Sequence, residues 1–149
     1  MNYMQEALVE AKKAFNKGET PIGAVLVYQD QIIARGHNLV ESDTDATQHA
    51  ELICLKEGAK VLNNWRLCET TLYVTIEPCM MCLGAMVLSR VKRLVYGADG
   101  PRHGALKQFA ADHPIHSLEI EGGVLSNDCA RLMSEFFKIR RHGKLKSPL

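Results

Sequence analysis

The stretch TLYVTIEPCMMC, residues 71–82, decides the fold that this sequence predicts. Its first half, TLYVTI, is rich in β-branched and aromatic residues and predicts a strand. Pro78 suits the first turn of a helix, so we predict a helix over residues 79–89 directly after the strand. Cys79 and Cys82 lie three residues apart at its start, where both sulfurs can bind one ion and where the helix N-terminus favours thiolates.

Helices and strands alternate on both sides of this stretch. Apolar residues at every third or fourth position predict a helix over residues 4–17, which Gly18 ends. The β-rich runs 23–28 and 32–35 predict a hairpin, and a polar loop follows over residues 38–47. Further along we predict a helix over 47–61, strands over 94–96 and 118–120, and a last helix from residue 126 or 127 to 141. This order is typical of an α/β fold in which helices cover both faces of one sheet.

The size and composition of the chain limit the classes of protein to consider. Its 149 residues suit a single domain spanning 1–149 with one active site. No apolar run approaches the roughly 20 residues that a membrane helix needs, so we expect no membrane association. The N-terminal segment mixes acids with bases and lacks the apolar run of a signal peptide, which predicts a cytoplasmic location.

The net charge of +1 conceals two parts of opposite sign. Residues 1–89 contain 7 Lys and Arg against 11 Asp and Glu, a net of −4, whereas residues 90–149 contain 11 against 6, a net of +5. The basic second part suits a polyanionic ligand, although surface charge often segregates without one. Composition alone leaves both interpretations open.

A second motif, HAE at residues 49–51, complements the two cysteines. His49, Cys79 and Cys82 make three protein ligands for zinc and leave the fourth tetrahedral position for water, as in catalytic sites. Zinc lowers the pKa of water to about 7, but hydrolysis also needs a group that moves protons. Glu51 is the candidate, since it lies near the start of the same predicted helix as His49. The combination predicts a zinc hydrolase with one Zn²⁺ per subunit.

Each motif alone is weak. A single CxxC is common, and a lone His or Glu near a helix start is usually a cap or a surface residue. Cys54 and Cys68 could instead join the CxxC pair in a four-cysteine structural zinc site, but spacings of 14 and 11 residues fit no paired-cysteine pattern and leave HAE unexplained. With Cys129 the cysteines number five, which argues against a disulfide framework. HAE and PCMMC together, each opening a predicted helix, are far more specific.

The two motifs form the H-x-E and P-C-x-x-C signature of zinc-dependent cytidine and nucleobase deaminases. Nearly the whole chain resembles the bacterial tRNA-specific adenosine deaminases of that superfamily. The resemblance is carried by TPIGAVLV (20–27), GHN (36–38), HAE (49–51), NWRL (64–67), TLYVTIEPCMMC (71–82), GAM and SRV (84–91), YGA (96–98) and SEFFKIRR (134–141). It implies a three-layer α/β/α cytidine deaminase-like fold around a central mixed sheet of about five strands.

The resemblance also implies the reaction, which is hydrolytic conversion of adenosine to inosine at the wobble position of a tRNA anticodon loop. Glu51 would move protons between the attacking water, the adenine ring and the departing amine. Asn38 matches the family position for an amide that hydrogen-bonds the target base, although from sequence alone it could be a turn residue. The backbone around Ala24 and the segment before Pro78 would wall the pocket. Glu77 would have a supporting structural role, because one carboxylate meets the need for proton transfer.

Two partners follow from the resemblance. The last predicted helix leads into a basic segment containing Lys138, Arg140, Arg141, Lys144 and Lys146. A solvated basic tail is the simpler interpretation from composition, but FFKIRR resembles the segment that family members lay against tRNA. The predicted helix CMMCLGAMVLSRV is apolar on more than one face, and relatives pair through this region, so we expect a homodimer.

Residues 97–119 depart from the family pattern. Relatives usually carry an acidic residue near position 100, where this chain has Gly100. They also have a longer run of small residues in this region. Because this region supplies substrate contacts in relatives, a deaminase of free nucleobases or nucleosides (guanine, cytosine or adenosine) on the same zinc site stays an alternative. A non-catalytic, zinc-stabilised RNA-binding subunit is another, against which Glu51 argues. His103, His113 and His116 suit loop or nucleic-acid contacts better than a second metal site.

Overall fold

The computed structural model describes residues 2–109 and 112–141, whose strands form one sheet in the order β2-β1-β3-β4-β5. The strands are β1 (Gly23–Tyr28), β2 (Gln31–His37), β3 (Thr70–Ile76), β4 (Arg93–Ala98) and β5 (Glu119–Glu121). β1 is antiparallel to β2 and β3, whereas β3, β4 and β5 run parallel. The helices are α1 (Tyr3–Asn16), α2 (Ala50–Leu62), α3 (Met80–Leu88) and α4 (Ser126–Arg141). Within the described residues, no helix is long and apolar enough to cross a membrane.

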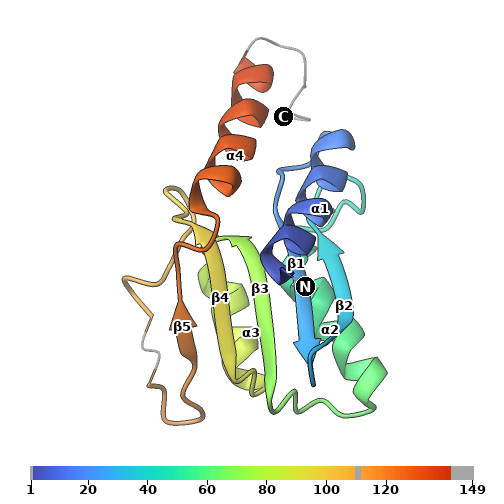
Figure 1. The fold of residues 1–149 in the computed structure, drawn as a ribbon, viewed down its shortest axis with the longest axis vertical. Coiled ribbons are helices and arrows are strands. Elements are labelled where there is room, and N and C mark those ends of the chain that lie inside the picture. The colour runs from blue at the N-terminus through green and yellow to red at the C-terminus, as the bar shows by residue number, and fades with distance from the viewer. Residues whose placement is uncertain (1, 110–111, 142–149) are drawn as a thin grey trace.

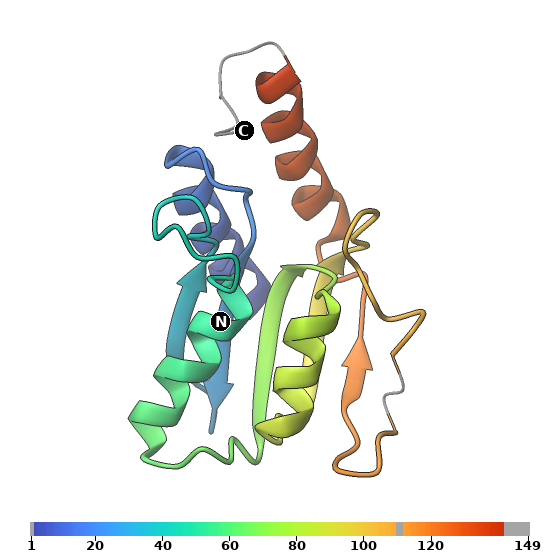
Figure 2. The ribbon, with the colours of Figure 1, turned by 180° about the vertical axis from the view of Figure 1, so that it is seen from behind.

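Helices cover both faces of this sheet. α2 and α3 lie side by side on one face, while α1 and the start of α4 lie on the other, and the rest of α4 projects past the end of the sheet (Figures 1 and 2). Each face has its own apolar core, with Leu72 and Leu83 in one and Met4 and Val95 in the other. The predicted three-layer α/β/α fold with a mixed sheet of about five strands is therefore confirmed.

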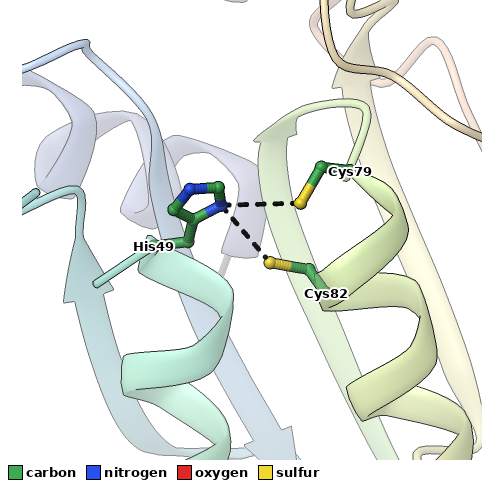
Figure 3. A group of neighbouring side chains, drawn as sticks. All are labelled: His49, Cys79 and Cys82. Atoms are coloured by element: carbon green, nitrogen blue, oxygen red, sulfur yellow. Dashed lines mark hydrogen bonds between the residues drawn. The ribbon is translucent and has the colours of Figure 1, made fainter. Parts of the chain in front are cut away.

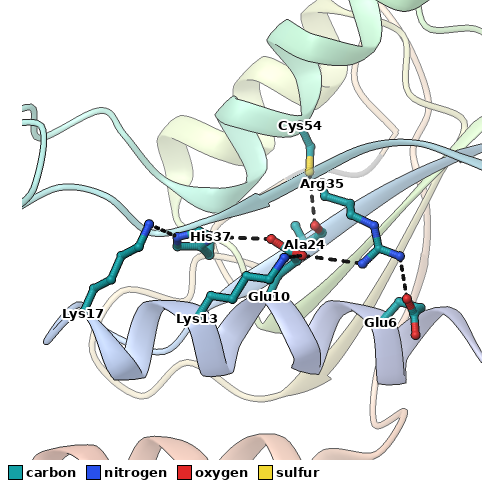
Figure 4. Close-up of polar contacts among 8 residues, drawn as sticks. All are labelled: Glu6, Glu10, Lys13, Lys17, Ala24, Arg35, His37 and Cys54. Atoms are coloured by element: carbon teal, nitrogen blue, oxygen red, sulfur yellow. Dashed lines mark hydrogen bonds and ion pairs between the residues drawn. The ribbon is translucent and has the colours of Figure 1, made fainter.

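A network of charged side chains joins α1 to β2. Glu10 of α1 is almost fully buried and accepts a hydrogen bond from Lys13 at 2.7 Å (Figure 4). Arg35 donates to the same carboxylate at 3.5 Å, and His37 Nδ1 lies 3.3 Å from its other oxygen. Because His37 is the last residue of β2, this network holds the end of the strand immediately before Asn38.

The predicted elements agree with the structure except at their ends. The largest difference is at α2, which begins at Ala50 rather than at residue 47. The Asp45 carboxylate accepts hydrogen bonds from the backbone N–H and the hydroxyl of Thr47, at 2.8 and 2.7 Å. This turn satisfies the local donors outside a helix and delays the helix start until after His49, whose backbone is extended.

Candidate active site

Two helix starts meet at one end of the sheet. α2 begins directly after His49 and α3 begins directly after Cys79, and both preceding residues have an extended backbone. The chain passes from the end of β3 into α3, which brings the first turn of α3, with Cys82, next to the start of α2 (Figure 3). Residues separated by about thirty positions therefore converge here because two motifs each open a helix.

His49, Cys79 and Cys82 have the geometry of a three-ligand metal site. Their ligand atoms lie within 4.8 Å of one another, and His49 Nδ1 is 3.6 Å from Cys79 Sγ and 3.5 Å from Cys82 Sγ (Figure 3). Tetrahedral zinc, with bonds of about 2.3 Å to sulfur and about 2.1 Å to nitrogen, separates an N ligand from an S ligand by roughly 3.5 Å. The three side chains thus fit zinc in the positions that they occupy.

The Glu51 carboxylate is buried beside these ligands. The residue is 3% exposed, and among the described residues its Oε1 has no hydrogen-bond partner. Burial raises the pKa of Glu51 to about 7, against the opposing effects of the backbone N–H and of His49. A buried, unpaired carboxylate oxygen requires a polar partner such as water. At this pKa the group can accept and return a proton near neutral pH.

The two cysteines differ in how readily they ionise. A hydrogen bond from Cys82, together with one from His49, outweighs burial and lowers the pKa of Cys79 to about 3. The same contact with Cys79, reinforced by burial, raises the pKa of Cys82. The hydrogen bond to Cys79 also raises the pKa of His49. One thiolate is therefore ready to bind a cation, and coordination by Cys82 would release a proton.

A pocket of about 260 Å³ is lined by two of the three candidate ligands, His49 and Cys79. Its walls include His49, Glu51 and Cys79, the residues after β2, the loop after β4, and α4. Asn38 also lines it, is 8% exposed, and accepts a hydrogen bond on Oδ1 from the backbone N–H of Val40 at 3.4 Å. The structure thus brings the predicted base-binding amide into the same pocket as the predicted metal ligands.

Two further carboxylates, Glu19 and Glu77, support the walls of this pocket. Glu19 is fully buried and accepts hydrogen bonds from the backbone N–H and the hydroxyl of Ser42, both at 2.6 Å. Glu77 accepts hydrogen bonds from the backbone N–H groups of Gly100 at 3.1 Å and Leu106 at 3.0 Å. The contacts of Glu77 agree with the supporting role expected for it. Glu19 was not predicted, and its position just before the TPIGAVLV segment was the available signal.

Ala24 and Pro78 lie beside the pocket but are not among the residues that line it. Ala24 is fully buried inside β1, where its carbonyl accepts a hydrogen bond from Cys54 at 3.3 Å, and Ile22 before the strand lines the pocket instead. The Pro78 carbonyl accepts a hydrogen bond from the backbone N–H of Ala105 at 3.1 Å. The segments next to these two residues do line the pocket, through Ile22 before Ala24 and through Ile76 and Glu77 before Pro78.

The four-cysteine alternative does not fit the structure. Cys54 is buried against the carbonyl of Ala24, and burial raises its pKa well above the ordinary value for a thiol. Cys68 is exposed and precedes β3, whereas Cys79 follows that strand. The length of β3 separates them, so these cysteines cannot share one ion.

The remaining predicted contacts divide between the pocket and the surface. His103 lines the pocket, whereas His116 Nε2 lies 2.7 Å from the Val91 carbonyl and His113 Nδ1 accepts the N–H of Ile115 at 3.1 Å. On α4, Arg140 lines the pocket and Lys138 and Arg141 are exposed. Lys144 and Lys146 lie outside the described residues.

Comparison with known proteins identifies the family. A family model described as MafB19-like deaminase matches residues 1–141. The chain is 47% identical to a tRNA-specific adenosine deaminase of Bacillus subtilis (strain 168), over 95% of this chain and 91% of that protein. It belongs to the tRNA-specific adenosine deaminase family. A chloroplastic tRNA(adenine(34)) deaminase of Arabidopsis thaliana is 48% identical over 93% of this chain, which spans 12% of that longer protein.

Solved structures with the tRNA adenosine deaminase fold agree with this placement. One, from biochemical and structural studies of A-to-I editing by tRNA:A34 deaminases at the wobble position, is 37% identical with a TM-score of 0.81, over 87% of this chain and 97% of that one. A guanine deaminase from Bacillus subtilis is 30% identical with a TM-score of 0.66, over 100% of both chains. The fold thus serves proteins named for a tRNA and for a free base, so the choice of substrate depends on the pocket.

Proposed function

We propose that this chain is a zinc-dependent tRNA adenosine deaminase that forms inosine at the wobble position from one active site in a single domain, 1–149. The observation that carries the proposal is the convergence of His49, Cys79 and Cys82 on one point beside the buried Glu51 carboxylate. Family membership supports the choice of substrate, since the Bacillus subtilis relative is named for adenosine in tRNA.

The reaction needs one group that carries protons, and we assign this role to Glu51. Zinc, when bound by His49, Cys79 and Cys82, would polarise a water molecule and lower its pKa. Glu51 would take a proton from the attacking water as the water oxygen bonds to C6 of adenine, and would return that proton to a ring nitrogen, as in zinc nucleobase deaminases generally. A second proton, from the new C6 hydroxyl, passes through Glu51 to the amine. Ammonia then leaves, and the C6 carbonyl of inosine forms.

We assign the target base to the Asn38 side of the pocket. Because Asn38 Oδ1 accepts the N–H of Val40, the amide NH₂ is left to donate to a base nitrogen. Glu19 and Glu77 hold the two flanking loops, which limits the rearrangement needed on binding. Ala24 and Pro78 act as supports behind the wall.

The anticodon loop of a tRNA is the partner that α4 suits. Lys138, Arg140 and Arg141 lie in its last turns, next to the pocket that Arg140 lines, and cations there can neutralise RNA phosphates. A flipped base in a single-stranded loop would reach the pocket without the opening of a base-paired RNA helix. The proposal includes a cytoplasmic location, because all five cysteines are unpaired and thiolate ligands persist where thiols are kept reduced.

A homodimer through α3 is part of the same proposal. Met80, Met81 and Leu88 are 51%, 37% and 60% exposed, although the helix contains no charged residue. Trp65, in the segment between α2 and β3, is another exposed apolar side chain, at 54%. A Cβ added at Gly84 would meet no heavy atom within 4 Å, so a second helix can approach this face closely. An exposed apolar helix face without charge suits a two-fold contact between identical subunits.

A comparison of substrates tests the function. Purified zinc-loaded protein is incubated with an anticodon stem-loop carrying adenosine at the wobble position, with free adenosine, guanine and cytosine, and with the same stem-loop carrying guanosine there. Inosine is measured after nuclease digestion, and ammonia release is measured for the free bases. We expect inosine from the adenosine stem-loop and none from the guanosine control.

The alternatives predict different results in the same experiment. Turnover of guanine without turnover of RNA would replace the tRNA proposal by a base deaminase, the alternative that similarity to a guanine deaminase favours. Tight RNA binding without turnover of any substrate would indicate a non-catalytic subunit, for which the buried Glu51 carboxylate has no use.

A further inference from the structure

His37, the last residue of β2, lies between two charged side chains of opposite sign. Its Nε2 is 3.0 Å from Lys17 Nζ, and its Nδ1 is 3.3 Å from Glu10 Oε1 (Figure 4). The side chains of His37 and Glu10 are only 12% and 4% exposed. The contact between the ring and the carboxylate is therefore largely shielded from water.

These two partners select one tautomer of the His37 ring. A lysine ammonium has three N–H donors and no acceptor, so Nε2 accepts from Lys17 and carries no proton. The ring proton is then on Nδ1, which donates it to Glu10 Oε1. The opposite tautomer, or a ring protonated on both nitrogens, would turn an N–H toward the ammonium. Only the Nδ1–H tautomer satisfies both contacts.

The partners of His37 are themselves fixed to α1. Glu10 lies within the helix, and its Oε2 accepts hydrogen bonds from Lys13 at 2.7 Å and from Arg35 at 3.5 Å. Lys17 is the residue that ends the helix, where its backbone N–H donates to the last carbonyls. His37 is thus bound to α1 at two points, one within the helix and one at its C-terminal end.

The end of β2 connects these contacts to the pocket. His37 pairs with Gly23 of β1, and the N–H of Asn38 donates to the Ile22 carbonyl at 3.1 Å. Successive side chains of an extended strand point to opposite faces of a sheet. Because His37 contacts α1, Asn38 faces the other side, where α2 begins and where the pocket includes His49 (Figures 1 and 2).

We infer that His37 is a positioning residue for Asn38, which follows it in the chain. The Nδ1–H ring, held between Lys17 and Glu10, fixes the end of β2 from which the Asn38 amide meets the target base. The inference rests on the proposed function, in which that amide binds the base, and it adds a residue that does not itself line the pocket. A binding group that is already in position costs less to order when the substrate arrives.

NMR of the ring nitrogens tests the tautomer independently of activity. In isotopically labelled, zinc-loaded protein at neutral pH, two-bond proton–nitrogen correlations distinguish Nδ1–H from Nε2–H rings. The signals of His37 are those absent from His37→Asn. We expect the Nδ1–H form. An Nε2–H ring, or a ring protonated on both nitrogens, would overturn the inference, because Lys17 would then have no acceptor.

Kinetics of His37→Leu in the zinc-loaded protein test the positioning. We expect kcat/KM on the adenosine stem-loop to fall about 10 to 100-fold, since a small displacement of a positioned group costs that much. Affinity for the same stem-loop without a base at the wobble position should not change, because this RNA offers Asn38 nothing to bind. His37→Asn retains an N–H donor near the position of Nδ1 and should restore part of the loss.

A double variant connects the effect to Asn38. Asn38→Ala removes the amide, so adding His37→Leu to it should cause no further loss of kcat/KM. Lys13→Gln is the matched control, because it removes another hydrogen bond of Glu10 without changing β2. It should lower the free energy of unfolding and leave kcat/KM unchanged.

The pattern of losses decides the outcome. Additive losses in the double variant, an equal loss with Lys13→Gln, or weaker binding of the stem-loop that lacks the base would each overturn the positioning role. If the wild type deaminates no RNA, the proposed function fails. The same variants, measured on the free base that the wild type does deaminate, then decide the role of His37.

Discussion

At the scale of single residues, the roles proposed for Glu51 and its neighbours separate metal binding from proton transfer. Glu51→Gln keeps the shape of the side chain and leaves His49, Cys79 and Cys82 in place. We expect one zinc per subunit, as in the wild type, because glutamine removes no ligand. We expect kcat to fall by about 10² to 10⁴-fold, since the proton carrier is lost. Elemental analysis and single-turnover deamination measure the two quantities.

The companion variants make the result specific. Glu57→Gln changes an exposed glutamate of the same helix, which pairs with Lys60, and should leave both zinc content and kcat unchanged. His49→Ala removes a ligand and should abolish both. Full activity of Glu51→Gln would show that another group carries the proton, and loss of zinc from it would make Glu51 a ligand.

The three candidate metal ligands, which the structure brings together, could be named from sequence because each motif is short. His49 and Glu51 share one helix start, and Cys79 and Cys82 share another, so local spacing describes each half of the site. The sequence predicted a supporting role for Glu77 but not the partners of Glu77, and it predicted no role for Glu19. Glu19 acts on Ser42, and Glu77 acts on Gly100 and Leu106, which lie more than twenty residues away. Contacts of that range depend on how loops pack, which periodicity does not describe.

At the scale of elements, the contact between α1 and β2 should depend on pH through Glu10. Burial raises the pKa of Glu10, but hydrogen bonds from Lys13 and His37 outweigh it, so the pKa lies below its ordinary value of 4.5 (Figure 4). A carboxyl group with a lowered pKa in the folded state stabilises the fold above its unfolded pKa. That stabilisation is lost as pH falls below 4.5 and through the lower folded value.

Urea denaturation of Glu10→Gln measures this effect. At neutral pH we expect the variant to be less stable by about 1–3 kcal/mol, because Lys13 and Arg35 lose a buried charged partner. The difference from wild type should shrink below pH 4.5. Glu57→Gln, at an exposed pair, should change the free energy of unfolding by less than about 0.5 kcal/mol at either pH. A difference for Glu10→Gln that does not vary with pH would mean that packing, not charge, is responsible.

The order of helices and strands along the chain could be predicted from local sequence patterns, whereas the ends of these elements depend on individual contacts. Amphipathic spacing identified α1 and α4, and β-rich runs identified the strands. The start of α2 depended on a side-chain contact, because Asp45 holds Thr47 in a turn. The order of strands within the sheet depends on the pairing of β1 with β3, which are separated in the chain by β2 and α2. A pattern along the sequence does not specify this pairing.

At the scale of the whole molecule, the exposed apolar face of α3 predicts that two subunits pair through this helix. Leu88 is 60% exposed near the C-terminal end of a helix whose other face is packed on the sheet. Leu88→Lys would place a charge in the proposed two-fold contact, where each substitution occurs twice and the two lysines repel or remain unpaired. Light scattering should therefore report a dimer for the wild type and a monomer for the variant, with unchanged helix content by circular dichroism.

Val9→Lys is the matched control for this experiment. Val9 is 44% exposed on α1, and α1 covers the face of the sheet opposite α3 (Figures 1 and 2). A lysine there also replaces an exposed apolar side chain on a helix, yet it should leave the dimer intact. Dissociation by both variants would indicate a general effect of added charge. A wild type that stays monomeric at every concentration tested would rule out pairing through α3, while leaving the chemistry within each subunit untouched.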